Sequence, residues 1–182
     1  MAVTRDLIID SFHKHLKEHG FEGTSVEDIA RDLHISKKTI YVHFDSKDEI
    51  YRQVIEREAA AACESIAAEL ASRPTSREQV EGLIARAFEA TRAWWDSSTE
   101  TNHVRRYHYQ VAESAFAEAY TDLFRRYIRE GIKRGEFTAK DSEITVRLVA
   151  GLVLAGTRML QHDSDPDLEG CVIEAAIRML AC

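Results

Sequence analysis

The sequence predicts an all-α protein, and three observations lead to this prediction. The 182 residues include only two prolines and eight glycines, the residues that most often interrupt helices. Long stretches are rich in Ala, Glu, Arg and Leu, which favour helices. Apolar residues recur every three or four positions, so that successive segments would each present an apolar face. The hydrophobic fraction of 45% is ample for a folded core, and 30% charged residues indicate a water-exposed surface.

The first predicted helix begins at about Thr4 and ends near Gly20, because Ile8, Phe12 and Leu16 are spaced by four and share one face. A second, short helix follows, whose apolar face is Val26, Ile29, Ala30 and Leu33. Two capping boxes fit its start equally well: Thr24 with Glu27, or Ser25 with Asp28. The pattern then breaks at His34 and Ile35.

A third helix is predicted from Ser36, a good N-cap residue, with Ile40 and Phe44 facing inward. Its other side carries cations, hydroxyls, an imidazole and one apolar group, the mixture needed to hold phosphates and to contact base edges in a DNA major groove. A further capping box, Ser46 to Glu49, starts the next helix. The predicted DNA-binding residues of this helix-turn-helix are Thr24, Ser25, Ser36, Lys37, Lys38, Thr39, Tyr41, Val42, His43 and Lys47.

These residues resemble the N-terminal DNA-binding domain of the TetR family of bacterial transcriptional repressors. The resemblance covers about residues 4–50 and is carried by F-E-G-T-S-V-E-D-I-A (21–30) and I-S-K-K-T-I-Y-V-H-F-D-S-K-D-E-I (35–50). His34 stands where the family usually has Gly in the inter-helix turn, and His tolerates a positive φ. Val42 replaces an aromatic residue often found there, which bears on the operator sequence.

The resemblance implies a one-component transcriptional regulator, most simply a repressor that a small molecule releases from its operator. A homodimer would place two recognition helices, the helix that starts at Ser36 in each subunit, on a near-palindromic double-stranded operator, with half-sites about 34–36 Å apart. We expect Lys37, Thr39, Tyr41, His43 and Lys47 to contact phosphates. Lys38 and Val42 are the candidates for base contact, by donor bonds to guanine and by apolar contact with a thymine methyl group.

The net charge of −7 is unusual for a DNA-binding protein. Residues 1–50 hold 7 Lys and Arg against 10 Asp and Glu, a balance of −3. Between residues 34 and 47, however, Lys37, Lys38 and Lys47 face one acid, Asp45. This local positive edge on an acidic chain favours a specific DNA binder with weak non-specific affinity.

A long helix is expected over residues 46–71, and its start marks the predicted domain boundary. Residues 1–46 would form the N-terminal domain, and residues 47–182 would form a helical regulatory and dimerisation domain. Ser76 is expected to cap the next helix, which ends at Trp94-Trp95. Residues 100–134 are expected to form two helices with a kink or short break near 113–117. The last helix is expected to start with Asp165 as cap and Pro166 in its first position.

Residues 144–160 are apolar on almost all sides, and a second apolar stripe follows at 168–180. Burial inside one subunit would explain one such helix, but two in so short a chain favour a twofold four-helix interface. The predicted dimer residues are Leu148, Leu152, Ala155, Gly156, Met159, Val172, Ile173, Ala176, Ile177 and Leu180.

The resemblance also implies an effector cavity in the helical body, and the aromatic and basic residues between 88 and 124 are the candidates for its walls. The same aromatic residues could equally be core, in which case the protein would be an effector-independent regulator controlled by its abundance or by a protein partner. The candidate pocket residues are Phe88, Arg92, Trp94, Trp95, His103, Arg106, Tyr107, Tyr120 and Phe124.

No enzyme motif stands out, and neither catalysis nor a cofactor is expected. Glu100 and His103 form one ExxH, but a di-iron bundle needs a second. A metal sensor built on His103 and His108 is an alternative without typical ligand spacing, so no metal site is predicted. Three cysteines without paired spacing, no signal peptide and no run of about 20 apolar residues lead us to expect a cytoplasmic protein without a membrane segment.

Overall fold

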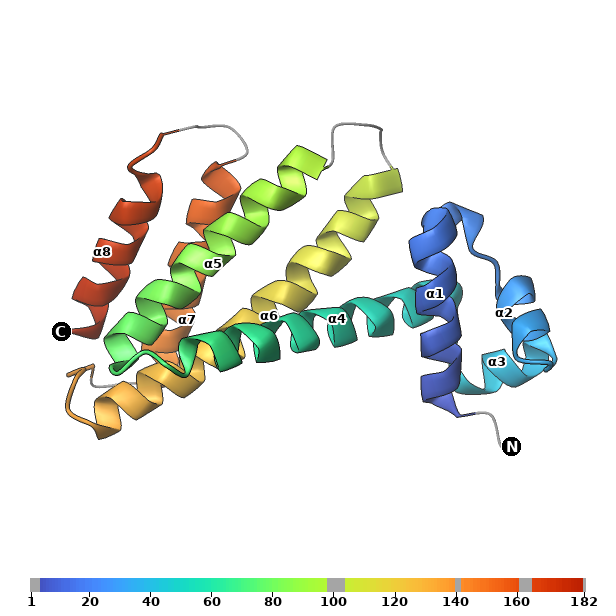
Figure 1. Ribbon diagram of the computed structural model, residues 1–182, viewed down its shortest axis with the longest axis horizontal. Helices are drawn as coiled ribbons and strands as arrows, with labels where there is room; N and C mark the ends of the chain where they lie inside the picture. Colours follow the sequence, from blue (N-terminus) through green and yellow to red (C-terminus); the bar gives the residue numbers. More distant parts are fainter. Residues whose placement is uncertain (1–3, 98–103, 140–141, 161–164, 182) are drawn as a thin grey trace. The chain divides into compact units, whose positions relative to one another are not determined.

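The computed structural model describes residues 4–97, 104–139, 142–160 and 165–181, and it confirms the all-α prediction. These residues contain eight α-helices and no β-strand (Figure 1). The helices are α1 (Arg5–Gly23), α2 (Val26–Asp32), α3 (Lys37–His43), α4 (Lys47–Leu70), α5 (Ser76–Ser97), α6 (Val104–Lys133), α7 (Ser142–Met159) and α8 (Leu168–Leu180). None of the helices in the described ranges is long and apolar enough to span a membrane.

The chain divides into two compact units, Met1–Ala59 and Ala60–Cys182, so the division falls inside α4. The first part of α4 packs in the first unit, where Ile50 and Val54 are buried and the ring of Tyr51 lies 5.1 Å from that of Phe21. The last part of α4 contributes Ile66 and other side chains to the core of the second unit. The predicted boundary after residue 46 lies at the start of this shared helix.

The first unit is built from α1, α2, α3 and the start of α4 around fully buried apolar side chains. The members predicted from helical spacing are Ile8, Phe12, Ile29, Ile40 and Phe44. The predicted end of α1 at Gly20 corresponds to an interruption: Gly20 has φ 68°, a left-handed conformation that glycine adopts without strain, and one further turn follows. Thr4 caps α1, as its hydroxyl accepts from the Leu7 N–H at 3.4 Å.

Of the two possible capping registers for α2, the structure selects Ser25 with Asp28. The Ser25 hydroxyl accepts the Asp28 N–H at 3.1 Å and donates to the Asp28 carboxylate at 2.5 Å. Thr24 instead donates its hydroxyl to the Gly20 carbonyl at 2.7 Å, which closes the end of α1. One residue therefore ends α1 and the next begins α2.

The second unit packs α5, α6, α7 and α8 together with the end of α4 (Figure 1). Phe88 of α5 and Phe124 of α6 are among the largest fully buried side chains of its core. Gly156 of α7 allows a close helix approach, because a Cβ atom there would lie 2.7 Å from Val172 of α8 and 3.0 Å from Phe88. The apolar α7 is thus partly explained by burial inside its own chain.

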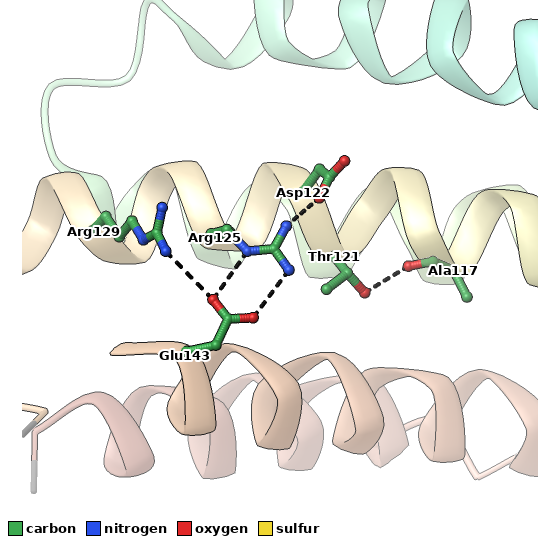
Figure 2. A network of polar contacts seen from close by, with 6 residues as sticks. All are labelled: Ala117, Thr121, Asp122, Arg125, Arg129 and Glu143. Carbon is green, nitrogen blue, oxygen red and sulfur yellow. Dashed lines mark hydrogen bonds and ion pairs between the residues drawn. The ribbon is translucent and has the colours of Figure 1, made fainter. Parts of the chain in front are cut away.

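Ion pairs join α6 to α7 near both ends of α7. Figure 2 shows Arg125 donating to both carboxylate oxygens of Glu143, each at 3.1 Å, while Arg129 reaches the same carboxylate at 3.5 Å. At the other end, Arg158 donates two bonds to Glu113 at 2.8 and 2.9 Å. Paired, forked geometry of this kind sets the register of the two antiparallel helices.

Several predicted helix boundaries were wrong, among them the end of α5, which lies at Ser97 and not at Trp94-Trp95. The break predicted near 113–117 does not occur, since α6 is one helix without Gly or Pro in that stretch. The cap of α5 is Thr75, whose hydroxyl accepts the Glu78 N–H at 3.1 Å, whereas Ser76 is the first helical residue. Helix α8 begins two residues later than expected, because the Asp165 carboxylate accepts the Asp167 N–H at 2.9 Å and forms a turn through Pro166.

Candidate nucleic-acid interface

Helix α3 presents the outward face that the sequence predicted. Ser36 caps it by accepting the Thr39 N–H at 3.1 Å, and Ile40 is completely buried against the first unit. On the opposite side Tyr41 is 48% exposed and Val42 is 75% exposed. Lys38 beside them is exposed as well. A phenol, a branched apolar group and an ammonium therefore lie together on a rigid, capped helix.

The turn between α2 and α3 adopts the conformation expected of a helix-turn-helix. His34 has φ 53°, as expected for a residue that stands in place of glycine. The Ile35 N–H donates to the Ala30 carbonyl at 2.9 Å and the His34 N–H to the Arg31 carbonyl at 3.1 Å, which closes the end of α2. These local bonds close the turn between α2 and α3.

The two lysines at the edges of this face have different partners. Lys37 forms an ion pair with Glu27 of α2, which lowers the pKa of the Glu27 carboxyl and raises the pKa of the Lys37 ammonium. Lys47, in the first turn of α4, donates to the Phe21 carbonyl at 2.5 Å and lies 3.9 Å from the centre of the Phe21 ring. A carbonyl and a ring do not neutralise its charge, so Lys47 remains a positive group at a helix N-terminus.

Arg5 is a residue that the sequence analysis missed. Its guanidinium donates to the His43 carbonyl, the last of α3, at 2.7 Å and to the Glu49 carboxylate at 2.8 Å. It also lies 4.3 Å above the Phe44 ring. The other Glu49 oxygen accepts the Asp45 N–H at 2.6 Å, so α1, the end of α3 and the start of α4 meet at one ion pair. These bonds lower the pKa of Glu49, with the Asp45 N–H as the main cause.

Two histidines of α1 contact carboxylates on other helices of the same unit. His15 lies 2.6 Å from the Asp32 carboxylate of α2, and His13 lies 2.6 Å from the Glu58 carboxylate of α4. The contact with His15 lowers the pKa of Asp32. Both histidines therefore have structural partners and do not add to the face formed by α3.

The remaining predicted contact residues differ in accessibility. Thr24 is only 1% exposed and its hydroxyl is used inside the chain, so its assignment to the interface is corrected. Ser25 and His43 are half-buried. The hydroxyls of Ser36 and Thr39 lie 3.0 Å apart at the start of α3, on its accessible side.

Four of the candidate pocket residues have described side chains, and they do not share one environment. Phe88 and Phe124 belong to the packed core of the second unit. Tyr120 packs against that core, and burial raises the pKa of its hydroxyl. Arg92 is exposed and pairs with Glu169 of α8 at 2.9 Å. His103, with Glu100 of the ExxH, and the side chains of Trp94, Trp95, Arg106 and Tyr107 lie outside the described residues.

The candidate dimer residues separate into two groups. Four are buried in the core of their own chain, which corrects their assignment to an interface: Gly156, Val172, Ala176 and Leu180. The other six are exposed or half-buried: Leu148, Leu152, Ala155, Met159, Ile173 and Ile177. Ile144, which was not on the list, is 49% exposed and extends the exposed apolar stripe of α7 by one turn.

Comparison with known proteins identifies the first unit. Residues 8–54 match the family model of bacterial regulatory proteins of the tetR family. A negative transcriptional regulator of the biofilm operon icaADBC, IcaR of Staphylococcus epidermidis, is 40% identical over 52 residues, 29% of this chain and 28% of that protein. The chain thus matches less than a third of the length of this relative.

Among solved structures, RolR in complex with resorcinol matches with a TM-score of 0.65 at 19% identity, over 97% of this chain and 87% of that one. FadR of Bacillus subtilis in complex with stearoyl-CoA matches with a TM-score of 0.53 at 19% identity, over 98% of both chains. At this identity the two structures establish a shared fold. Residues 8–54 therefore match the tetR family of bacterial regulatory proteins, and the chain as a whole shares the fold of these two solved structures.

Proposed function

We propose that this protein is a transcriptional repressor that binds a near-palindromic double-stranded DNA operator as a homodimer. The observation that carries the proposal is the outer face of α3, where Lys38, Tyr41 and Val42 are exposed on a helix held by a cap and by buried Ile40. The ammonium can donate to guanine, the valine can contact a thymine methyl group and the phenol can donate to phosphate. The relationship to IcaR, a negative regulator, supports repression.

Helix α7 supports the proposed homodimer. Its exposed apolar residues Ile144, Leu148 and Met159 follow one another at helical spacing, with Leu152 and Ala155 between them. An apolar stripe on a water-exposed helix is typical of a surface that a partner covers. A second copy of the chain is the proposed partner, because a twofold axis would pair two recognition helices with two half-sites.

A small hydrophobic effector is the proposed signal that releases the protein from DNA. Two proteins of the same fold were solved with ligands, resorcinol for RolR and stearoyl-CoA for FadR. The effector must bind the form that does not hold DNA more tightly, since equal affinity for both forms would shift nothing. The proposed site uses the aromatic and basic residues of α5 and α6, including Arg92 and Tyr120.

The competing function is a regulator without an effector. The complete burial of Phe88 and Phe124 in a packed core favours it, because these two rings are then structural. A panel of small aromatic and aliphatic carboxylic acids distinguishes the two functions. The effector proposal expects one of them to change tryptophan fluorescence and to weaken operator binding together, whereas failure of every ligand class to do so would favour the competing function.

Selection of binding sites from random double-stranded DNA tests the repressor proposal directly. We expect an inverted repeat to be enriched, with half-site centres about one helical turn apart. Operator affinity should exceed affinity for unrelated duplexes at least about 1,000-fold at physiological salt. Enrichment of no sequence, or equal affinity for all duplexes, would overturn the proposal.

A further inference from the structure

Lys37 and Glu27 form a contact that the sequence did not predict. Glu27 lies in the first turn of α2 and Lys37 is the first residue of α3, so their ion pair bridges the two helices of the helix-turn-helix. Both side chains are about half exposed, at 49% for Lys37 and 54% for Glu27. The pair therefore lies at the surface, on the edge of the face that would meet DNA.

Among the three lysines of this face, only Lys37 has a carboxylate partner in the described part of the chain. Lys38 is exposed, and none of the described ion pairs includes it. Lys47 contacts a carbonyl and an aromatic ring, which leave its charge intact. In the absence of DNA, one of the three positive charges is thus neutralised within the protein.

We propose that Glu27 is an autoinhibitory carboxylate that competes with DNA phosphates for Lys37 and thereby holds down the affinity for DNA, most importantly for DNA outside the operator. This inference rests on the proposed DNA-binding function and concerns the strength of that binding. The geometry supports it because a carboxylate and a phosphate offer the same kind of acceptor to an ammonium group. The Lys37 ammonium can form a full ion pair with only one of these two groups at a time.

The salt dependence of binding provides a measure of this competition. A lysine that neutralises a phosphate releases a counterion from DNA, which adds about 0.9 to the slope of log K against log salt. If Lys37 stays with Glu27, no counterion is released through Lys37. If Lys37 moves to a phosphate, the Glu27 carboxylate is left uncompensated beside a polyanion. In either case the complex with DNA loses about one ionic contact. This loss is a larger fraction of the binding free energy for non-operator DNA, because non-operator binding consists almost entirely of such contacts.

The experiment compares the full-length wild type with Glu27→Gln on the selected operator and on an unrelated duplex, between 50 and 200 mM salt. We expect Glu27→Gln to tighten binding to both duplexes about three- to ten-fold at the low-salt end and to steepen the salt slope by about 0.9. Glu22→Gln is the matched control. It removes the same charge from the same unit, at an exposed residue whose described contacts include no residue of α3.

A double-variant cycle with Lys37→Gln isolates the pair. We expect the gain from Glu27→Gln to disappear in the Lys37→Gln background. Thermal unfolding of each variant checks that the fold is kept. A Glu27→Gln effect no larger than that of Glu22→Gln, or one that persists without Lys37, would overturn the inference while leaving the repressor proposal intact. Wild-type protein that binds neither duplex would overturn the repressor proposal itself.

Discussion

At the scale of single residues, Val42 is the most exposed of the large hydrophobic side chains in the described residues, with 75% of its surface accessible. An isolated exposed valine is ordinary. Here it lies next to half-exposed Tyr41 on a helix whose opposite side, at Ile40, is fully buried. The helix is therefore rigid where it is buried and offers varied chemistry where it is exposed, which suits the recognition of base edges.

The first prediction concerns this recognition. Lys38→Ala and Val42→Ala should each change the preferred base at one position per half-site, because each removes a proposed base contact worth about 1–3 kcal/mol. Tyr41→Ala should instead weaken binding to all sequences, since its proposed partner is a phosphate. Site selection with each variant measures the preference. The same consensus from Lys38→Ala, Val42→Ala and wild type would contradict the assignment of base contacts.

The second prediction concerns Cys63, a buried thiol on α4. Burial raises the pKa of Cys63 from 9.0 to about 11. The folded state therefore keeps this proton where the unfolded state has lost it, and the resulting stability is present below pH 9 and lost as the pH rises to 11. We expect the free energy of unfolding to fall by up to about 2 kcal/mol over this range through Cys63 alone.

Chemical denaturation at a series of pH values measures this dependence. Cys63→Ala should show a shallower fall between pH 9 and 11 than the wild type, whatever its stability at pH 7. Exposed Cys171 provides the control, and Cys171→Ala should keep the wild-type dependence. Buried Tyr127, whose pKa burial also raises, acts in the same direction above about pH 10 in all three proteins. An identical pH dependence in Cys63→Ala and wild type would contradict the assignment.

At the scale of helices, the position of α3 depends on both of its ends. Its start is held locally, by the Ser36 cap. Its end is held from a distance, by the Arg5 guanidinium on the His43 carbonyl, and Arg5 is itself held by Glu49 of α4. A cation at a helix C-terminus is favourable to the helix, and here it also connects α3 to two other helices.

The third prediction tests this connection. Arg5→Ala should lower operator affinity about ten-fold, the equivalent of one base contact, because the end of α3 would lose its anchor. Arg5→Lys should restore the affinity only in part, since one ammonium cannot reproduce the two-armed guanidinium. Operator titrations beside circular dichroism spectra measure affinity and fold separately.

Arg57→Ala is the matched control for Arg5→Ala. Arg57 is similarly exposed, at 41% against 44%, and also joins α1 to α4, through Asp10 at 2.5 Å, but its described contacts do not include α3. Equal losses of affinity in Arg5→Ala and Arg57→Ala would show that Arg5 acts through general stability and not through the position of α3.

At the scale of the whole molecule, the exposed face of α7 is the feature that the single chain leaves unexplained. Leu148 is 55% exposed and Met159 is 50% exposed, although the same helix buries Val146, Val149 and Val153 in the core. Ion pairs to α6 hold α7 near both of its ends, so its outer face is a fixed surface. A dimer interface there would remove apolar area from water at no cost to the core.

The fourth prediction is that Leu148→Arg makes the protein monomeric without unfolding it. An arginine at the centre of the proposed interface would bury two unpaired charges across a twofold axis, whereas in the monomer the side chain would be solvated. Sedimentation equilibrium should give half the wild-type mass, and operator binding should be lost. Ser65→Arg, at an exposed polar position of α4, should keep both. A dimeric Leu148→Arg protein, or a monomeric wild type at micromolar concentration, would contradict the proposed interface.

Substitution at Gly156, in contrast, would not test the dimer. A Cβ atom there would already meet Val172 and Phe88 of the same chain, so larger residues would disturb the core first. The sequence shows Gly156 and Leu148 on one apolar helix, but it does not show which of them faces inward when nearly every face is apolar.

The sequence by itself determined the helix-turn-helix, because the signals for it are local. The Ser36 cap, the positive φ of His34 and the inward positions of Ile29, Ile40 and Phe44 depend on residues within about one helical turn. Where two local signals competed, as at Thr24 and Ser25, sequence alone left both registers open. In the folded chain the Thr24 hydroxyl donates to the Gly20 carbonyl, and Ser25 is the residue that caps α2.

Only the tertiary structure decided which distant groups meet. Glu136 accepts the N–H groups of Ser76 and Arg77, 60 and 59 residues away, at 2.7 and 3.3 Å, and so completes the start of α5 behind the Thr75 cap. Arg5 meets the end of α3 across 38 residues. Such contacts depend on how helices pack, and a long charged side chain can reach many partners with similar energies until packing leaves one within hydrogen-bond distance. The Ser36 cap could therefore be predicted from the sequence, whereas the Arg5 anchor and the Lys37–Glu27 pair appear only in the folded chain.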